Sequence, residues 1–296
     1  MTRLSGTTLG AVTAAAGGAS WLHAAQDAPL FSISLAEWSV HQALFKGRMN
    51  HLDFPAFAKR ECGIDAVEYV NQFFMKHAKD DKYLAALKQR CVDEGVTSVL
   101  IMCDGEGDLG APDRAARSEA VANHRKWVDA ALALGCHAVR VNAHSTGTRD
   151  EQVKLVADGL RQLAEHAAPH GLNVLVENHG GFSSDGAWVA EVMRKVDLPN
   201  CGTLPDFGNF NDYDRYQGVA EMMPFAKGIS AKSFRFNDEG NETETDFKRM
   251  MEIAVRAGFH GYVGIEWEGK VPAQEREGIL LTKQLLERVR ESLASK

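Results

Sequence analysis

The sequence predicts an α/β fold, a single-domain (β/α)8 TIM barrel over residues 29–296. Short apolar runs alternate along the chain with amphipathic segments, as expected for strands and helices that follow one another. Eight such units occur, candidate polar residues stand at the ends of many different runs, and no glycine-rich phosphate turn follows the first run. These three observations favour a closed barrel over an open doubly wound sheet.

The eight apolar runs are the predicted strands. Their near-continuous apolar character is typical of parallel strands that are covered on both faces. In chain order they cover residues 31–38, 66–73, 96–103, 136–143, 172–179, 201–208, 227–234 and 261–268.

Five amphipathic segments between or after these runs are predicted helices. Four of them begin near residues 81, 117, 148 and 246 and end at Gly95, Gly135, Gly171 and Gly258, and the last covers about residues 274–293. Glycine ends helices because it readily takes the left-handed backbone conformation, so helix, glycine and strand in succession are typical of repeated βα units. We see no linker and no second domain.

Residues 1–28 read as a leader segment. Arg3 precedes a stretch of small and apolar residues up to Leu22, and the Leu22-His23-Ala24 sequence resembles a cleavage site. The segment resembles a twin-arginine export leader but contains a single arginine. It predicts a periplasmic or exported protein, and the alternative is a cytoplasmic protein with an N-terminal extension.

The charge balance argues against two classes of partner. The formal net charge is -7 and the pI is about 5.9, whereas nucleic acids and anionic membranes need a basic face. We therefore expect neither a nucleic acid nor a membrane as partner. The five cysteines are odd in number and form no CxxC pair, which indicates free thiols and no zinc knuckle.

Three acidic residues stand at corresponding strand ends: Glu177 in LVENHGG, Asp206 in LPDFGNF and Glu266 in GIEWEG. The carboxyl ends of barrel strands meet at one face, so these side chains are expected to converge. Converging carboxylates repel one another unless a proton or a cation neutralises them, which predicts a divalent metal ion held by all three. The alternative is that each acid caps a helix or pairs with an arginine.

Other polar residues at strand ends are candidates for catalysis or substrate binding. Lys232 ends an apolar strand and could stabilise an enolate, act as a base or simply pair with a carboxylate. Aromatic side chains near the mouth could stack on a sugar. The predicted substrate-binding residues, each of which could instead be an ordinary cap or loop residue, are Glu68, Asn142, His144, His179 and Asn209.

The motifs VENHGG, PDFGNF, SAKSF and IEWEG, in this order, resemble the sugar phosphate isomerase/epimerase superfamily of xylose-isomerase-like barrels, and the resemblance covers about residues 31–290. It implies a Mn²⁺, Mg²⁺, Co²⁺ or Zn²⁺ ion held by Glu177, Asp206 and Glu266. The family usually adds a histidine two residues before the lysine of strand seven. Here Ser230 stands at that position, and a hydroxyl is a weaker ligand than imidazole.

The resemblance implies a metal-dependent isomerase or epimerase acting on a small carbohydrate. One carboxylate would remove the proton α to a carbonyl, with Glu177, Glu266 and Lys232 as the catalytic residues. A lyase or hydratase on a keto-sugar or keto-glycoside is the runner-up, and a non-catalytic sugar-binding barrel is the alternative of another class. A DNA-repair nuclease on this barrel would need extra histidine ligands and a basic groove, which the sequence lacks. A homo-oligomer is also possible for such barrels.

Overall fold

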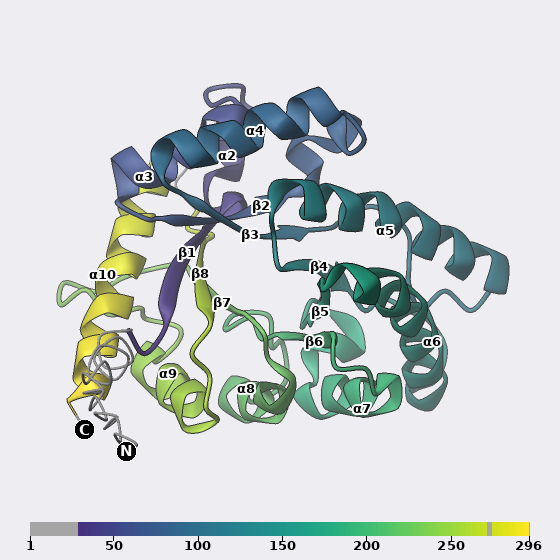
Figure 1. Ribbon diagram of the computed structural model, residues 1–296. Helices are drawn as coiled ribbons and strands as arrows, with labels where there is room; N and C mark the ends of the chain where they lie inside the picture. Colours follow the sequence, from purple (N-terminus) through teal and green to yellow (C-terminus); the bar gives the residue numbers. More distant parts are fainter. Residues whose placement is uncertain (1–28, 271–273, 296) are drawn as a thin grey trace, which may run out of the picture.

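The computed structural model describes residues 29–270 and 274–295, and the predicted leader lies outside the described residues, so it stays a prediction. Eight strands form the centre of the molecule and helices surround them, which confirms the predicted (β/α)8 barrel (Figure 1). No helix of the described ranges is both long and apolar enough to cross a membrane.

Each predicted run contains one strand. The strands are β1 (Ser32–Ala36), β2 (Ala66–Val70), β3 (Thr97–Met102), β4 (Ala138–Asn142), β5 (Asn173–Glu177), β6 (Cys201–Leu204), β7 (Ile229–Ser233) and β8 (Tyr262–Trp267). They are shorter than the apolar runs because residues such as Phe207 pack beyond the strand ends. All ladders are parallel, in the order β6-β5-β4-β3-β2-β1-β8-β7.

Two isolated parallel bridges, Thr203 with Ala226 and Asp206 with Ser230, join the ends of this order and nearly close the barrel. The second bridge matters for the site. The amide of Phe207 donates to Ser230 O at 3.0 Å, and the amide of Ser230 donates to Pro205 O at 2.9 Å. The backbone therefore fixes Asp206 directly beside Ser230.

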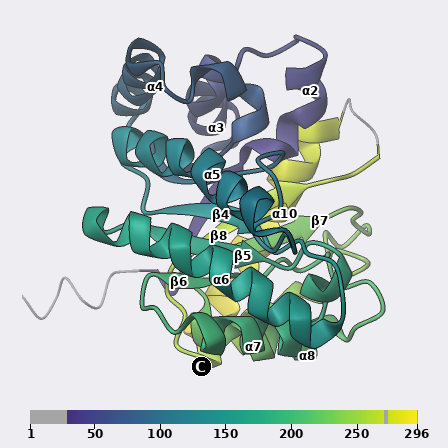
Figure 2. The ribbon, with the colours of Figure 1, turned by 90° about the vertical axis from the view of Figure 1, so that its right-hand side faces the viewer.

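The helices form an outer layer, and Figure 2 shows α5, α6 and α7 following one another along one side. Their bounds are α2 (His41–Phe45), α3 (Phe54–Cys62), α4 (Asp81–Glu94), α5 (Arg114–Leu134), α6 (Arg149–Ala167), α7 (Gly186–Val196), α8 (Arg215–Met222), α9 (Phe247–Arg256) and α10 (Glu275–Ala294). The five predicted helices are present. Helix α5 begins before Arg117 because the Asp113 side chain caps it by accepting from the Ala116 amide.

Two apolar layers pack the fold. The larger one lies between the strands and the helices and includes Trp127, Trp188 and Phe54. A smaller one lies inside the barrel and includes Val70, Leu100 and Leu175. Polar residues lie above it on the inward faces of the strands, so the chemistry is confined to the C-terminal mouth.

Candidate active site at the C-terminal mouth of the barrel

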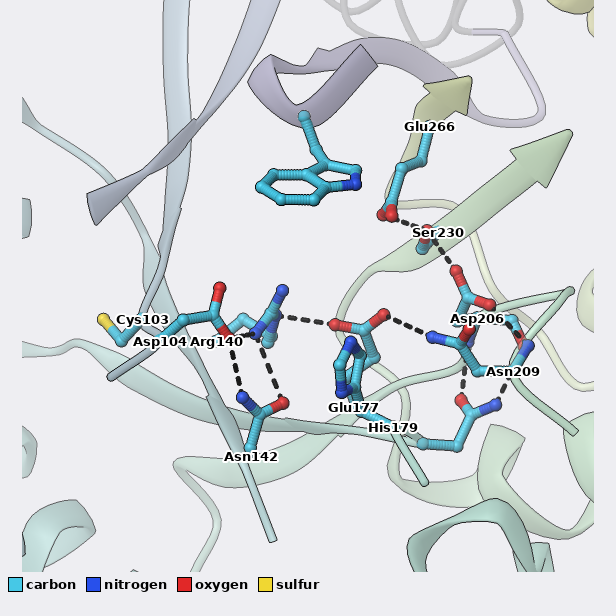
Figure 3. Close-up of polar contacts among 12 residues, drawn as sticks. Cys103, Asp104, Arg140, Asn142, Glu177, His179, Asp206, Asn209, Ser230 and Glu266 are labelled. Carbon is cyan, nitrogen blue, oxygen red and sulfur yellow. Dashed lines mark hydrogen bonds and ion pairs between the residues drawn. The ribbon is translucent and has the colours of Figure 1, made fainter. Parts of the chain in front are cut away.

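The structure brings the three predicted acids together (Figure 3). Glu177 is the last residue of β5, Asp206 follows β6 after Pro205, and Glu266 lies in β8. All three are buried, and one carboxylate oxygen from each lies within 4.8 Å of the others. Three residues that are 29 and 60 positions apart in sequence thus meet in one spot, as expected where parallel strands end.

Ser230 on β7 links two of these acids. Its hydroxyl lies 2.7 Å from Asp206 Oδ2 and 3.0 Å from Glu266 Oε2. A hydroxyl carries one proton and can donate fully to only one carboxylate. The second contact therefore requires a proton or a cation near Asp206 and Glu266. Ser230 thus lies in the site.

Lys232, two residues further along β7, supplies one positive charge. Its Nζ lies 2.9 Å from Glu266 Oε1, 3.8 Å from Asp206 Oδ2 and 3.3 Å from Glu268 Oε1. Burial would lower the pKa of Lys232, but the neighbouring carboxylates outweigh it and raise this pKa well above its ordinary value. Lys232 is therefore an ammonium ion, suited to stabilising negative charge and unsuited to the role of a base.

Arg140 on β4 supplies the second positive charge, and sequence reasoning missed it. Its Nε lies 2.6 Å from Glu177 Oε2, and its Nη1 lies 3.0 Å from Asp104 Oδ1. Asn142 Nδ2 also donates to Asp104 Oδ1 at 2.7 Å. Burial would raise the pKa of Asp104, but Arg140 and Asn142 outweigh it and hold this pKa at about 2. An arginine inside an apolar predicted strand was the available signal for a buried counter-charge.

Two asparagines fix the loops that follow β5 and β6. Asn178 exchanges two hydrogen bonds with the backbone of Asp206, at 2.7 and 3.0 Å. The amides of Gly208 and Asn209 both donate to Asp206 Oδ1 at 2.8 Å. Asn209 Nδ2 also donates to Glu177 Oε1 at 3.2 Å. Asn209 therefore orients two members of the triad, while the role of Asn178 was not predicted.

The other predicted substrate-binding residues lie at different depths. His144 and His179 are exposed at the mouth and stack with ring centroids 6.3 Å apart. Asn142 is half-buried beside Arg140. Their contact with substrate stays a prediction.

Glu68 lies deeper than expected, inside the barrel. It is 1% exposed, and Ser34 Oγ donates to its Oε1 at 2.5 Å. Gly264 of β8 makes room for it, because a Cβ there would lie 2.5 Å from Glu68 Oε2. Burial raises the pKa of Glu68 to about 8. Glu68 therefore lies below the mouth as a neutral carboxylic acid at neutral pH.

The charge inventory fits a divalent cation. Burial, reinforced by neighbouring carboxylates, raises the pKa values of Glu177 and Asp206 to about 7. Burial would also raise the pKa of Glu266, but Lys232 outweighs it and holds this pKa below its usual range. The two buried cations are each shared with a further acid, Asp104 or Glu268. Negative charge thus exceeds positive charge at the triad, and Glu177 Oε2 accepts no well-aligned hydrogen bond. Oxygen donors in such a cluster are the ligands that Mg²⁺ and Mn²⁺ prefer.

The family comparison agrees with this fold. A xylose isomerase-like TIM barrel model matches residues 56–291, and the chain belongs to that family. No curated protein gives a significant sequence match.

Several solved structures share the fold. A 3-keto-D-glucoside 4-epimerase from E. coli has a TM-score of 0.64 at 19% identity, covering 79% of this chain and 94% of its own. The IOLI protein, solved with a bound zinc atom, has a TM-score of 0.72 at 14% identity over 88% and 99%. A D-psicose 3-epimerase solved with D-fructose has a TM-score of 0.69 at 12% identity over 88% and 99%. At these identities the likeness shows the fold alone.

Proposed function

We propose that the protein is a divalent-metal-dependent isomerase or epimerase that acts on a sugar or keto-sugar. The observation that carries the proposal is the buried Glu177, Asp206 and Glu266 triad, whose ligand oxygens lie within 4.8 Å of one another at the barrel mouth. The names of the related structures support the same class, since they include a keto-glucoside epimerase and a ketose epimerase, and one of them holds zinc.

The three carboxylates would hold the ion. When bound, it would supply positive charge for a substrate carbonyl and the adjacent hydroxyl, which acidifies the C–H bond beside the carbonyl. Its identity among Mn²⁺, Mg²⁺, Co²⁺ and Zn²⁺ is left open by a ligand set that lacks histidine.

Proton transfer belongs to Glu177 and Glu266, which approach from β5 and β8. One carboxylate takes the proton from the carbon next to the carbonyl, and the electron pair of that C–H bond moves toward the carbonyl oxygen as the enediolate forms. Return of a proton to the opposite face of the same carbon gives the epimer, whereas its return to the neighbouring carbon gives the isomer. Loss of a β-leaving group from the same enediolate would instead give the lyase reaction.

Lys232 and Arg140 are the buried cations beside the two carboxylates that transfer the proton. The Lys232 ammonium, 2.9 Å from Glu266 Oε1, is placed to stabilise negative charge that develops on the substrate oxygen. Arg140 keeps Glu177 oriented through the 2.6 Å contact with its Oε2. Both cations are fixed by buried partners, so they are in place before the substrate binds.

Deuterium uptake tests the proposal. The protein is incubated in D₂O with Mn²⁺ and a panel of keto-sugars, and exchange of the proton α to the carbonyl is followed by NMR. We expect exchange with the wild type and none with Glu266→Gln, and a matched Glu106→Gln variant, which changes a buried acid outside the site, should exchange normally. If sugars bind but the proton α to the carbonyl does not exchange with Mn²⁺, Mg²⁺, Co²⁺ or Zn²⁺ present, the chain belongs instead to the non-catalytic sugar-binding class.

A further inference from the structure

Four rings form a continuous aromatic surface at the rim of the mouth, which we call the aromatic shelf. It consists of Trp38, His41, Phe45 and Phe73. Trp38 stacks on His41 with centroids 4.6 Å apart, and Phe45 lies 6.0 Å from Trp38 and 5.1 Å from Phe73. The residues come from the connections after β1 and β2, so they stand over the C-terminal end of the barrel.

Core packing accounts for only part of the shelf, because Trp38 and Phe73 are half-buried against the apolar layer inside the barrel. Helix α2, which carries His41 and Phe45, has no buried residue, and Phe45 is 58% exposed. Leaving a large apolar side chain in water forgoes stabilisation that burial would give. Contiguous apolar surface at the rim of a polar cleft typically marks a binding site.

Hydrogen bonds anchor the segments that carry Trp38 and His41. The buried Glu37, directly before Trp38, accepts from the amide of Val70 at 3.0 Å and contacts His51 Nδ1 at 2.6 Å. The amide of Gln42 donates to Glu275 Oε1 at 2.8 Å, which ties α2 to α10. Such anchoring lowers the entropy lost when a ligand binds, because the backbone of these segments need not be ordered at that moment.

Direct contacts join the shelf to the triad. Trp38 Nε1 donates to Glu268 Oε1 at 2.8 Å, the same oxygen lies 3.3 Å from Lys232 Nζ, and Lys232 Nζ lies 2.9 Å from Glu266 Oε1. Three contacts of 2.8, 3.3 and 2.9 Å thus link the indole to the triad, so a ligand bound at the triad has the shelf beside it. The partly exposed Glu268 carboxylate adds an acceptor for sugar hydroxyls between them.

We propose that the aromatic shelf binds the second ring of a two-ring substrate, a disaccharide or a glycoside with a ring-shaped aglycone, while the reacting sugar lies at the triad. This inference rests on the proposed function. The C–H face of a pyranose packs well on aromatic rings, and its hydroxyl edge would meet Glu268. A single-ring sugar bound at the triad would leave the shelf in water.

Calorimetric titration with sugars of one and two rings tests the inference. The probes are D-glucose and D-fructose against cellobiose and maltose, each with Mn²⁺ present. We expect a two-ring sugar to bind more tightly than either one-ring sugar. Phe45→Ala should weaken the binding of the two-ring sugar about 2- to 12-fold without changing the affinity for the one-ring sugars. The matched control is Leu132→Ala, which removes another exposed apolar side chain, 45% exposed, near the far end of α5.

The outcomes separate the two proposals. If one-ring sugars bind and Phe45→Ala leaves every affinity unchanged, the shelf inference is wrong and the proposed function stands. If none of the four sugars binds, the shelf inference is wrong, and the deuterium exchange of the keto-sugar panel decides the proposed function separately. Sedimentation of the same variants tests whether a second copy of the chain, rather than a sugar, covers the shelf. A dimer that Phe45→Ala dissociates, with sugar affinities unchanged, would make the shelf an interface between copies and overturn the inference.

Discussion

The guanidinium of Arg140 faces the carboxylate of Glu177 inside the barrel, with Nε 2.6 Å from Oε2. Arg140 is 5% exposed and Glu177 is fully buried. The arginine thus neutralises part of a site that has an excess of carboxylates, and its Nη1 binds Asp104 at the same time.

Removal of Arg140 should strongly destabilise the fold. Arg140→Leu leaves Glu177 and Asp104 without their cation in a buried setting, and breaking such a pair typically costs about 3–5 kcal/mol. Urea denaturation in the presence of a chelator measures the free energy of unfolding. The control Arg235→Leu breaks the exposed pair with Glu244 and should cost less than about 1 kcal/mol. An Arg140 effect as small as that of the control would contradict the buried counter-charge.

Ser230 gives a prediction that separates the metal-free from the metal-bound protein. Two side chains of β7, Ser230 and Lys232, contact both Asp206 and Glu266. Ser230→Ala removes the first of these two donors. Without metal we expect a loss of about 1–3 kcal/mol of stability, because the buried carboxylates lose a donor. With saturating Mn²⁺ most of the loss should disappear, since the ion stabilises the folded state through the same acids. Thermal unfolding with and without Mn²⁺ decides it, and an equal loss in both conditions would count against an ion at this place.

Glu68 predicts a pH dependence of stability. Its pKa is raised by burial to about 8 from an ordinary value of 4.5, so between these pH values the folded protein keeps a proton that the unfolded chain releases. Stability from this group is therefore fully present below about pH 4.5 and is lost as the pH rises through 8. Glutamine cannot ionise, so Glu68→Gln should gain about 2–5 kcal/mol relative to wild type between pH 5 and pH 9.

The pKa values of Glu177 and Asp206 are also raised, so these two groups add to the pH dependence of stability in both proteins. The difference between Glu68→Gln and wild type at each pH therefore reports on Glu68. Chemical denaturation of both proteins at pH 5, 7 and 9 with a chelator isolates the difference. A free-energy difference that stays constant over this range would show that Glu68 is already ionised in the folded protein.

Lys232 should act on the rate rather than on the binding of the sugar. Lys232→Met removes the ammonium beside Glu266 Oε1, and loss of one electrostatic donor to a developing oxyanion typically lowers the rate about 100- to 1,000-fold. Sugar affinity should change far less. The deuterium-exchange rate and the calorimetric affinity together measure the two effects. A variant that exchanges at the wild-type rate would remove Lys232 from the mechanism.

The barrel and its triad were predictable because both follow from periodic patterns. Apolar runs alternate with amphipathic helices, and the acids at the ends of three runs must converge when those strands lie parallel. Helices α2, α3, α7 and α8 were not predicted, and all four are short. Helices α7 and α8 each contain a glycine in a close contact with the other, Gly186 against Gly218, so tertiary packing replaces a long apolar repeat there.

The electrostatic partners in the site were harder to foresee. Arg140 interrupts an apolar strand, and only the position of β4 next to β5, in register Arg140 with Leu175 and Asn142 with Glu177, shows which acid it meets. The depth of Glu68 depends on a register shift between Val67 and Glu68 and on the space above Gly264. Both are properties of strand pairing, which no local pattern in a single sequence encodes.

We propose that Glu177, Asp206 and Glu266 together hold one divalent ion. The decisive measurement is elemental analysis of protein purified without added metal or chelator, for wild type, Glu177→Ala and the matched off-site variant Glu106→Ala. We predict about one ion per chain in wild type and in Glu106→Ala, and its loss in Glu177→Ala. Absence of metal in all three proteins, even after soaking at millimolar Mn²⁺, Mg²⁺, Co²⁺ and Zn²⁺, would contradict the account and leave Lys232 and Arg140 as the only cations of the triad.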